Sequence, residues 1–198
     1  MKKKQRVTVL HLSNVLFGTG AAVLAVGIGI LFLTFGPLAT QELRYTVHSI
    51  PKDIVPIDKE FGIVIPKLGA NARVIANVDP YDGKAYQYAL TKGVAHARGT
   101  SVPGAIGNIF LFAHSSENFY DALQYNSVFY LINKLEDGDK IYLYYHDNKF
   151  VYTVTGKKFV NSKDVSYLRG DSLKATLTLM TCWPPGTNSK RLLIFASL

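Results

Sequence analysis

The residue best suited to chemistry in this sequence is Cys182, the only cysteine among 198 residues. It ends a strand-like run in which Leu177 and Leu179 lie on one face, and Thr178, Met180 and Cys182 lie on the other. A thiol at the end of a strand, on its less apolar face, can meet a substrate. A single cysteine forms no internal disulfide, and no Cys/His spacing here resembles a zinc site. The sequence therefore makes Cys182 a candidate nucleophile.

A cysteine nucleophile needs a partner for its proton, because a free thiol has a pKa of about 8.5 and is mostly protonated at neutral pH. Five histidines are available. His11 lies at the expected entry to a membrane, His48 in a linker and His146 in an expected hairpin turn. His114 follows an apolar run and precedes a polar loop, which favours a position beside a groove. His96, with turn residues on either side, remains the alternative.

Arg191 opens the apolar run that follows the cysteine. Acyl transfer from a peptide creates an oxyanion, and a guanidinium offers it several fixed N–H donors with a permanent charge. From spacing alone, a surface arginine on an edge strand is an equally good interpretation, because Lys190 stands beside it. Trp183, with the Pro/Gly turn that follows it, ends the first run, so the two runs are expected to pair as a hairpin with a long loop.

The elements that position these residues are mostly strands and turns. Short apolar runs bounded by turn residues predict strands at 61–65, 73–78, 105–113, 140–145 and 150–155, besides the two runs around Cys182 and Arg191. Residues 81–90 and 119–135 have a partly helical pattern, and Asp79-Pro80-Tyr81 is read as a turn. This pattern predicts a mainly β protein, a closed or nearly closed β-barrel with short helices.

The N-terminal region has the pattern of a membrane anchor. No charged residue occurs between Arg6 and Glu42, and Val15 to Phe35 would rise about 30 Å as a helix, the thickness of a bilayer core. The basic cluster before it predicts a cytoplasmic N-terminus. A cleaved signal peptide is disfavoured, because the apolar run is long and lacks a clear cleavage site. We expect a cytoplasmic segment at 1–14, a single transmembrane anchor at 15–38, an extracytoplasmic linker at 39–60 and a catalytic domain at 61–198.

Several segments together resemble the sortase family of membrane-anchored cysteine transpeptidases. They are TLMTC (178–182), NIFLFAHSS (108–116), NSKRLLIF (188–195) and IPKLGANARVI (65–75). The resemblance covers about 61–198, raises His114 above His96, and makes Arg191 the third member of a site. It implies an eight-stranded sortase-type barrel, in which Thr181, Thr178, Ala113 and Trp183 are candidate substrate-binding residues. Ala113, where many sortases have glycine, and Trp183 with its two prolines depart from the family pattern.

The activity implied by the resemblance is transpeptidation at the cell membrane, with the catalytic domain outside. The partners would be secreted proteins with a C-terminal sorting signal similar to LPxTG, and an amine acceptor in a cell wall precursor or a pilin. No cofactor is expected. Glu117, Asp121, Glu136, Asp137 and Asp139 offer oxygen ligands, which leaves calcium dependence open.

The charge of the chain disfavours a nucleic-acid partner. Of the formal net charge of +8, four units come from the basic N-terminal cluster, and the mild remainder does not indicate nucleic-acid binding. Two further functions stay open at this point. One is a hydrolytic cysteine peptidase on the same barrel, and the other is a catalytically silent, membrane-tethered barrel that binds peptides.

Overall fold

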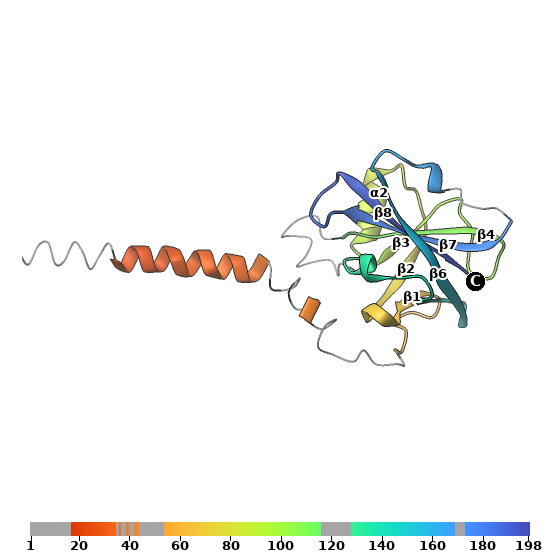
Figure 1. The fold of residues 1–198 in the computed structure, drawn as a ribbon, viewed down its shortest axis with the longest axis horizontal. Helices are drawn as coiled ribbons and strands as arrows, with labels where there is room; N and C mark the ends of the chain where they lie inside the picture. The colour runs from red at the N-terminus through yellow and green to blue at the C-terminus, as the bar shows by residue number, and fades with distance from the viewer. Residues whose placement is uncertain are drawn as a thin grey trace, which may run out of the picture. The chain divides into compact units, whose positions relative to one another are not determined.

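The structure is a computed structural model that describes residues 17–34, 36, 39, 42–43, 54–115, 128–168 and 173–198 (Figure 1). The chain divides into two compact units, residues 1–41 and residues 42–198. Each unit is described by itself.

The first unit contains one apolar helix, Phe17–Thr34. Its 18 residues have a mean hydropathy of 2.0, and among the described residues it is the one helix with the length and composition to cross a membrane. This matches the centre of the predicted anchor. The basic cluster and both ends of the anchor lie outside the described residues, so the orientation across a membrane stays a prediction.

The second unit is a closed barrel of eight strands in the order β1-β2-β3-β4-β7-β8-β6-β5 (Figure 1). Its strands are β1 (Phe61–Ile65), β2 (Ala70–Val78), β3 (Val94–Ala97), β4 (Gly107–Phe112), β5 (Lys140–Tyr145), β6 (Asn148–Asn161), β7 (Ala175–Trp183) and β8 (Lys190–Ser197). One α-helix, α2 (Gly83–Leu90), connects β2 to β3, and three short 3-10 turns, η1 (Pro66–Leu68), η2 (Ile132–Lys134) and η3 (Ser166–Leu168), complete the described elements. The predicted mainly β, closed barrel is confirmed.

Most predicted strands are present with shifted ends. The expected hairpin turn is confirmed, because His146 and Asp147 both have positive φ, 46° and 64°, between β5 and β6. Strand β6 continues far beyond the predicted Thr155, and β3 was not predicted as a strand. The predicted helix at 81–90 begins at Gly83, where Asp82 Oδ1 accepts hydrogen bonds from the N–H groups of the first turn. Of the pattern at 119–135, residues 119–127 lie outside the described residues.

The barrel interior holds the inward-facing apolar side chains of all eight strands, among them Ile63, Ile109, Leu111, Leu177 and Leu179. Of the eight strand pairings, six are antiparallel and two are parallel, and the parallel pairing that matters for the site joins β4 to β7. Parallel strands end at the same edge of a sheet. The residues that follow β4 and those that end β7 are therefore brought together, although they are far apart in the sequence.

Candidate active site

The end of β7 and the residues after β4 are joined by direct hydrogen bonds. The N–H of Ala113 donates to Met180 O at 3.2 Å, and Thr181 Oγ1 donates to Ala113 O at 2.9 Å. His114 follows Ala113, and Cys182 follows Thr181. These two bonds therefore fix the backbone that carries the imidazole relative to the backbone that carries the thiol.

The guanidinium is positioned by the neighbouring strand. In the antiparallel pair of β7 and β8, Cys182 lies opposite Arg191, and Met180 lies opposite Leu193. Directly opposed residues share one face of a sheet. Arg191 and Cys182 therefore emerge side by side on the outer face of the barrel.

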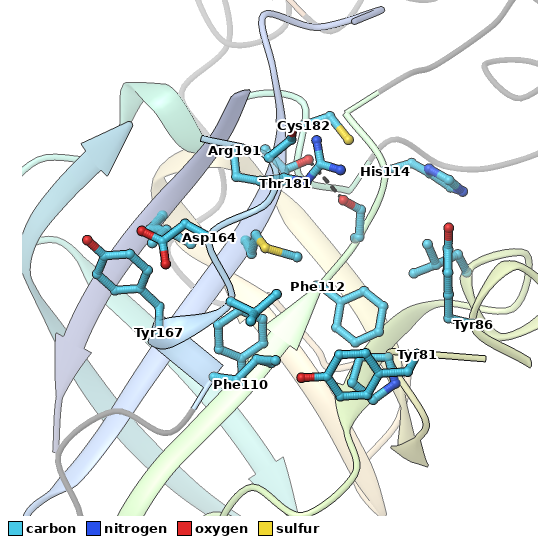
Figure 2. Close-up of a pocket in the computed structure, with 18 of the residues that line it drawn as sticks. Tyr81, Tyr86, Phe110, Phe112, His114, Asp164, Tyr167, Thr181, Cys182 and Arg191 are labelled. Carbon is cyan, nitrogen blue, oxygen red and sulfur yellow. Dashed lines mark hydrogen bonds between the residues drawn. The ribbon is translucent and has the colours of Figure 1, made fainter. Parts of the chain in front are cut away.

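All three side chains line one surface pocket of about 240 Å³, and Figure 2 shows them at one end of it. The rest of the lining is largely apolar and aromatic and comes from β4, β7, β8, the α2 region and the segment after β6: Pro80, Tyr81, Tyr86, Gln87, Leu90, Phe110, Phe112, Ala113, Ser162, Asp164, Val165, Tyr167, Leu168, Met180, Thr181 and Leu193. The pocket thus combines reactive groups at one end with an apolar groove beside them, the arrangement expected of a peptide-binding active site.

The contacts of Cys182 and Arg191 tie both residues to the loop between β7 and β8. The thiol donates a hydrogen bond to Asn188 Oδ1 at 3.4 Å. Nη1 of Arg191 donates to Lys190 O at 3.1 Å and to Asn188 O at 3.4 Å. Both residues are only half-buried. The guanidinium is thus held at one nitrogen, and the side chain lines the groove.

The two candidate histidines occupy different surroundings. His114 lines the pocket with Cys182, whereas His96 is in β3 and only 4% exposed. Nε2 of His96 donates to Ser101 O at 2.9 Å, and its Nδ1 accepts the N–H of Asn77 at 3.3 Å. Burial lowers the pKa of His96 below its ordinary value, against the opposing effect of the Ser101 bond. His96 therefore acts as a neutral hydrogen-bonding group of the barrel wall.

The four predicted substrate-binding residues differ in position. Ala113 and Thr181 line the pocket, but Thr181 is buried and its hydroxyl is bonded to Ala113 O. Thr178 donates to Asn108 Oδ1 at 2.9 Å, and the ring of Trp183 packs on that of Phe159 with centroids 5.3 Å apart. Neither Thr178 nor Trp183 belongs to the described lining of the pocket. Substrate binding by these residues remains a prediction.

Three residues in or beside this pocket were not singled out from the sequence. Tyr81 and Tyr86 line the pocket, and the ring of Tyr86 packs edge-on against Phe112 with centroids 6.3 Å apart. Figure 2 shows the Tyr86 hydroxyl pointing toward the His114 ring. Asn108, at the start of β4, accepts bonds from two threonines of β7. Asn108 could have been noticed in the sequence, because it is a polar residue two positions before Phe110 and therefore lies on the same face of the strand.

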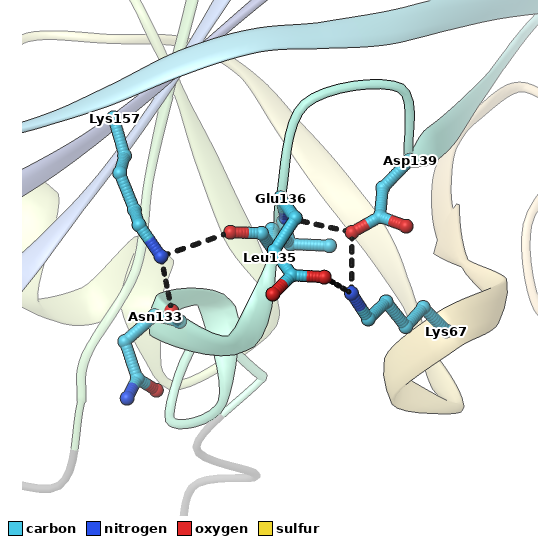
Figure 3. Close-up of polar contacts among 6 residues, drawn as sticks. All are labelled: Lys67, Asn133, Leu135, Glu136, Asp139 and Lys157. Atoms are coloured by element: carbon cyan, nitrogen blue, oxygen red, sulfur yellow. Dashed lines mark hydrogen bonds and ion pairs between the residues drawn. The ribbon is translucent and has the colours of Figure 1, made fainter.

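The acidic residues considered for calcium are partly engaged by a lysine. Lys67 Nζ lies 2.9 Å from Glu136 Oε2 and 2.8 Å from Asp139 Oδ2, and Figure 3 shows the ammonium between them. On the other side of the same loop, Lys157 Nζ donates to Asn133 O and Leu135 O. Among the described residues there is no group of three acidic, histidine or cysteine side chains arranged to hold a metal ion. Glu117 and Asp121 lie outside the described residues.

A closed barrel with a thiol, an imidazole and a guanidinium in one groove has the groups required for cysteine acyl transfer. Residues 63–198 match the family model of the sortase domain. The chain therefore belongs to the sortase family.

Two curated relatives support this assignment. Sortase A of Bacillus anthracis is 34% identical over 109 residues, which are 55% of this chain and 48% of that protein. Sortase A of Listeria monocytogenes is 29% identical over 157 residues, 77% of this chain and 64% of that protein. The matches thus span less than two thirds of either relative.

Solved structures agree with the fold. Sortase A from Corynebacterium diphtheriae is similar with a TM-score of 0.59 and 26% identity, over 71% of this chain and 60% of that one. Sortase C-1 from Actinomyces oris is similar in fold, with a TM-score of 0.59, 24% identity and coverage of 82% and 95%. The barrel described above is the sortase barrel.

Proposed function

We propose that this protein is a membrane-anchored cysteine transpeptidase that cleaves a sorting signal similar to LPxTG and transfers the new carboxyl end to an amine. The observation that carries the proposal is the common pocket of Cys182, His114 and Arg191, at the end of an apolar groove. Membership of the sortase family implies substrates with sorting signals and amine acceptors.

In the first half-reaction, the Cys182 thiolate attacks the carbonyl carbon of the scissile peptide bond. A C–S bond forms, and Arg191 stabilises the oxyanion or holds the substrate backbone. The C–N bond then breaks, and the leaving amine takes a proton from the His114 imidazolium. The product is a thioester on Cys182 and a neutral His114.

In the second half-reaction, an amine attacks the thioester and gives a proton to His114. The C–S bond breaks, the thiolate returns, and a new amide forms. A thioester keeps enough acyl-transfer potential to make an amide, which is why a cysteine suits this exchange. The groove next to Cys182 would hold the acyl part of the substrate between the two steps.

The cellular setting follows from the family and the N-terminal helix. Sortases are membrane-associated, and Phe17–Thr34 is one candidate span. We propose a single-pass anchor with the N-terminus in the cytoplasm and the barrel outside, because the basic cluster precedes the apolar segment. The substrates would then be secreted proteins, and the acceptor would be an amine of a cell wall precursor or a pilin.

The decisive experiment uses the full chain in detergent with a sorting-signal peptide, followed by intact-mass spectrometry. A mass increase equal to the acyl part of the peptide is expected for the parent and not for Cys182→Ala. An adduct that persists in Cys182→Ala, or that never forms in the parent, would contradict the proposal.

A second measurement separates transfer from hydrolysis. Addition of an amine acceptor is expected to yield mainly ligated peptide, whereas a peptidase would yield the hydrolysed product at the same rate with and without the amine. His114→Ala and His96→Ala form a matched pair for the histidine assignment. Loss of acyl transfer is expected in the first variant, and equal loss in both would contradict the choice of His114.

A further inference from the structure

The groove next to Cys182 does not end at the pocket that contains the three reactive side chains. A second cavity of about 520 Å³ adjoins it, lined by Arg98, Gly99, Thr100, Ser101, Ile106, Gly107 and Asn108. Both cavities are bordered by the same three residues, Pro80, Tyr81 and Leu168. The two cavities therefore meet at a passage with Tyr81 on one side and Leu168 on the other.

The floor beneath this passage is one continuous sheet surface. On β4, the side chains of Asn108, Phe110 and Phe112 share a face because they alternate along the strand. The adjacent face of β7 is fixed by the parallel register, in which Asn108 pairs with Thr176 and Phe112 pairs with Met180. The second cavity lies at the start of these two strands, and the reactive groups lie at their ends.

The two walls of the passage are held in place by hydrogen bonds. Asp79 forms an ion pair with Arg98 and accepts the N–H of Tyr81 at 2.9 Å, which fixes the turn that carries Tyr81. On the opposite side, Asn108 Nδ2 donates to Tyr167 O at 3.4 Å and holds the turn that carries Leu168 above the floor. The passage is thus a built feature of the groove.

The groove from Cys182 to the second cavity is longer than a sorting signal. At about 3.3 Å per residue, the stretch of β7 from Cys182 back to Thr176 spans about 20 Å. A five-residue signal of the LPxTG type covers at most about 17 Å when extended. A peptide whose scissile carbonyl lies at Cys182, and whose acyl part runs along β7 toward Thr176, reaches the second cavity with residues that precede the signal.

The acyl part of the substrate, which lies on the amino-terminal side of the scissile bond, is the part that must stay bound after the leaving amine departs. We therefore propose that the second cavity binds the two to four residues immediately before the sorting signal, as an extended segment with an apolar side chain. This inference rests on the proposed function and assigns a specificity subsite to the start of β4.

An apolar side chain fits the chemistry of this cavity. Ile106 and Tyr81 at its border are 72% and 75% exposed, although both are large hydrophobic residues. The hydroxyls of Ser101 and Thr100 already donate to Ile106 O and Ala97 O, and Arg98 is paired with Asp79. Ile106 and Tyr81 thus offer apolar surface that a ligand side chain can cover beside the polar part of the lining, and covering it would strengthen binding.

The test compares three peptides with the same sorting signal, using the full chain in detergent. The first peptide begins at the sorting signal and has an acetylated N-terminus. The second carries six residues before the signal, with leucines at the second and third positions before it. The third carries six serines and glycines before the signal. We expect the leucine peptide to have a kcat/KM for acyl transfer about tenfold above that of the other two peptides. A change of this size is expected when one leucine-sized side chain is buried. Most of the change is expected in KM.

Ile106→Asp is expected to abolish this advantage and to leave kcat/KM for the acetylated signal unchanged. Ile57→Asp is the matched control, because Ile57 is 65% exposed and lies outside the lining of both cavities. It should preserve the advantage. Equal rates for all three peptides, or an advantage that survives Ile106→Asp, would overturn the subsite and leave transpeptidation intact. Failure of every peptide to acylate Cys182 would instead overturn the proposed function, and the subsite with it.

Discussion

Cys182 on β7 and Arg191 on β8 are directly opposed in an antiparallel pair, so the thiol and the guanidinium leave the same face of the sheet as cross-strand neighbours. This pairing does not depend on the conformation of the long loop between the two strands. It places a fixed cation next to the atom at which an acyl group would be attached.

Replacement of Arg191 should therefore slow acylation. We expect Arg191→Ala to reduce the rate of acyl-enzyme formation about 100-fold, the effect of losing one oxyanion donor. Arg191→Lys should recover only part of this rate, because an ammonium keeps the charge but lacks the planar set of donors. Single-turnover mass spectrometry measures both. Lys190→Ala, at the exposed neighbouring position, is the control and should react like the parent.

Thr181 offers a test of how the thiol and the imidazole are aligned. Thr181→Val keeps the shape of the side chain but leaves Ala113 O without the bond from Thr181 Oγ1. We expect a loss of about 1 to 3 kcal/mol in the free energy of unfolding, together with slower acylation, because Ala113 precedes His114. Thermal unfolding and single-turnover rates report the two effects. The same change at exposed Thr155 should affect neither, and a Thr181→Val protein with parental stability would contradict this role.

Because His96 is buried, we expect the barrel to be less stable in acid. Its pKa is lowered in the folded protein, chiefly by burial, so the unfolded chain binds a proton more readily than the folded one. The free energy of unfolding should fall as the pH drops below about 6.5, the unfolded value, toward the lowered folded pKa. Above that range His96 is neutral in both states and contributes no pH dependence. His96→Gln should show a smaller drop in Tm between pH 7.5 and pH 5 than the parent, and an unchanged drop would count against this assignment.

The ion pairs of Lys67 are expected to stabilise the loop before β5. Lys67→Met removes the cation between Glu136 and Asp139, and we expect a loss of about 1 kcal/mol in the free energy of unfolding. Chemical denaturation measures this change. Lys174→Met, at an exposed lysine outside this cluster, is the control and should stay close to the parent.

The same contacts bear on calcium. Because Lys67 Nζ pairs with both Glu136 and Asp139, it cancels half of their negative charge and occupies one oxygen of each carboxylate, which weakens them as ligands of a divalent ion (Figure 3). We expect millimolar calcium, and its removal with a chelator, to shift the Tm by less than about 1 °C, which corresponds to no binding linked to folding. A rise of several degrees with calcium would show that acidic residues of this chain form a site.

Strands with alternating or continuous apolar runs were predictable from the sequence, and β1 and β5 have the predicted bounds. The four-residue strand β3 was missed because it is short and contains a histidine beside turn residues. Strand β6 was predicted too short because Gly156 and the two lysines after it interrupt the apolar pattern, although this half pairs with β8. Pairing with a neighbour, rather than local preference, determines such segments.

The residues proposed to react were singled out from the sequence, Cys182 because it is unique and His114 because it ends an apolar strand and fits the family resemblance. The structure places both in one pocket, and their reactivity stays a prediction. The walls of the groove were not singled out from the sequence. Tyr81 and Tyr86 belong to a turn and a helix whose position on the barrel depends on tertiary packing, such as the contact of Tyr86 with Phe112. Thr181 was grouped with the groove because it precedes Cys182, and it does line the pocket. Strand alternation also places it on the face of Leu179, so it is buried.

The parallel pairing of β4 with β7 also constrains when the site exists. Asn108 and Thr176, partners in that pairing, are 68 residues apart in the chain. A chain in which only β1 to β6 have formed contains the imidazole but neither the thiol nor the guanidinium in position. Closing so long a loop is a slow step with a large entropy cost. The proposed site and the closed barrel therefore arise together, and an incompletely folded molecule lacks the arrangement of Cys182, His114 and Arg191 on which the proposed acyl transfer depends.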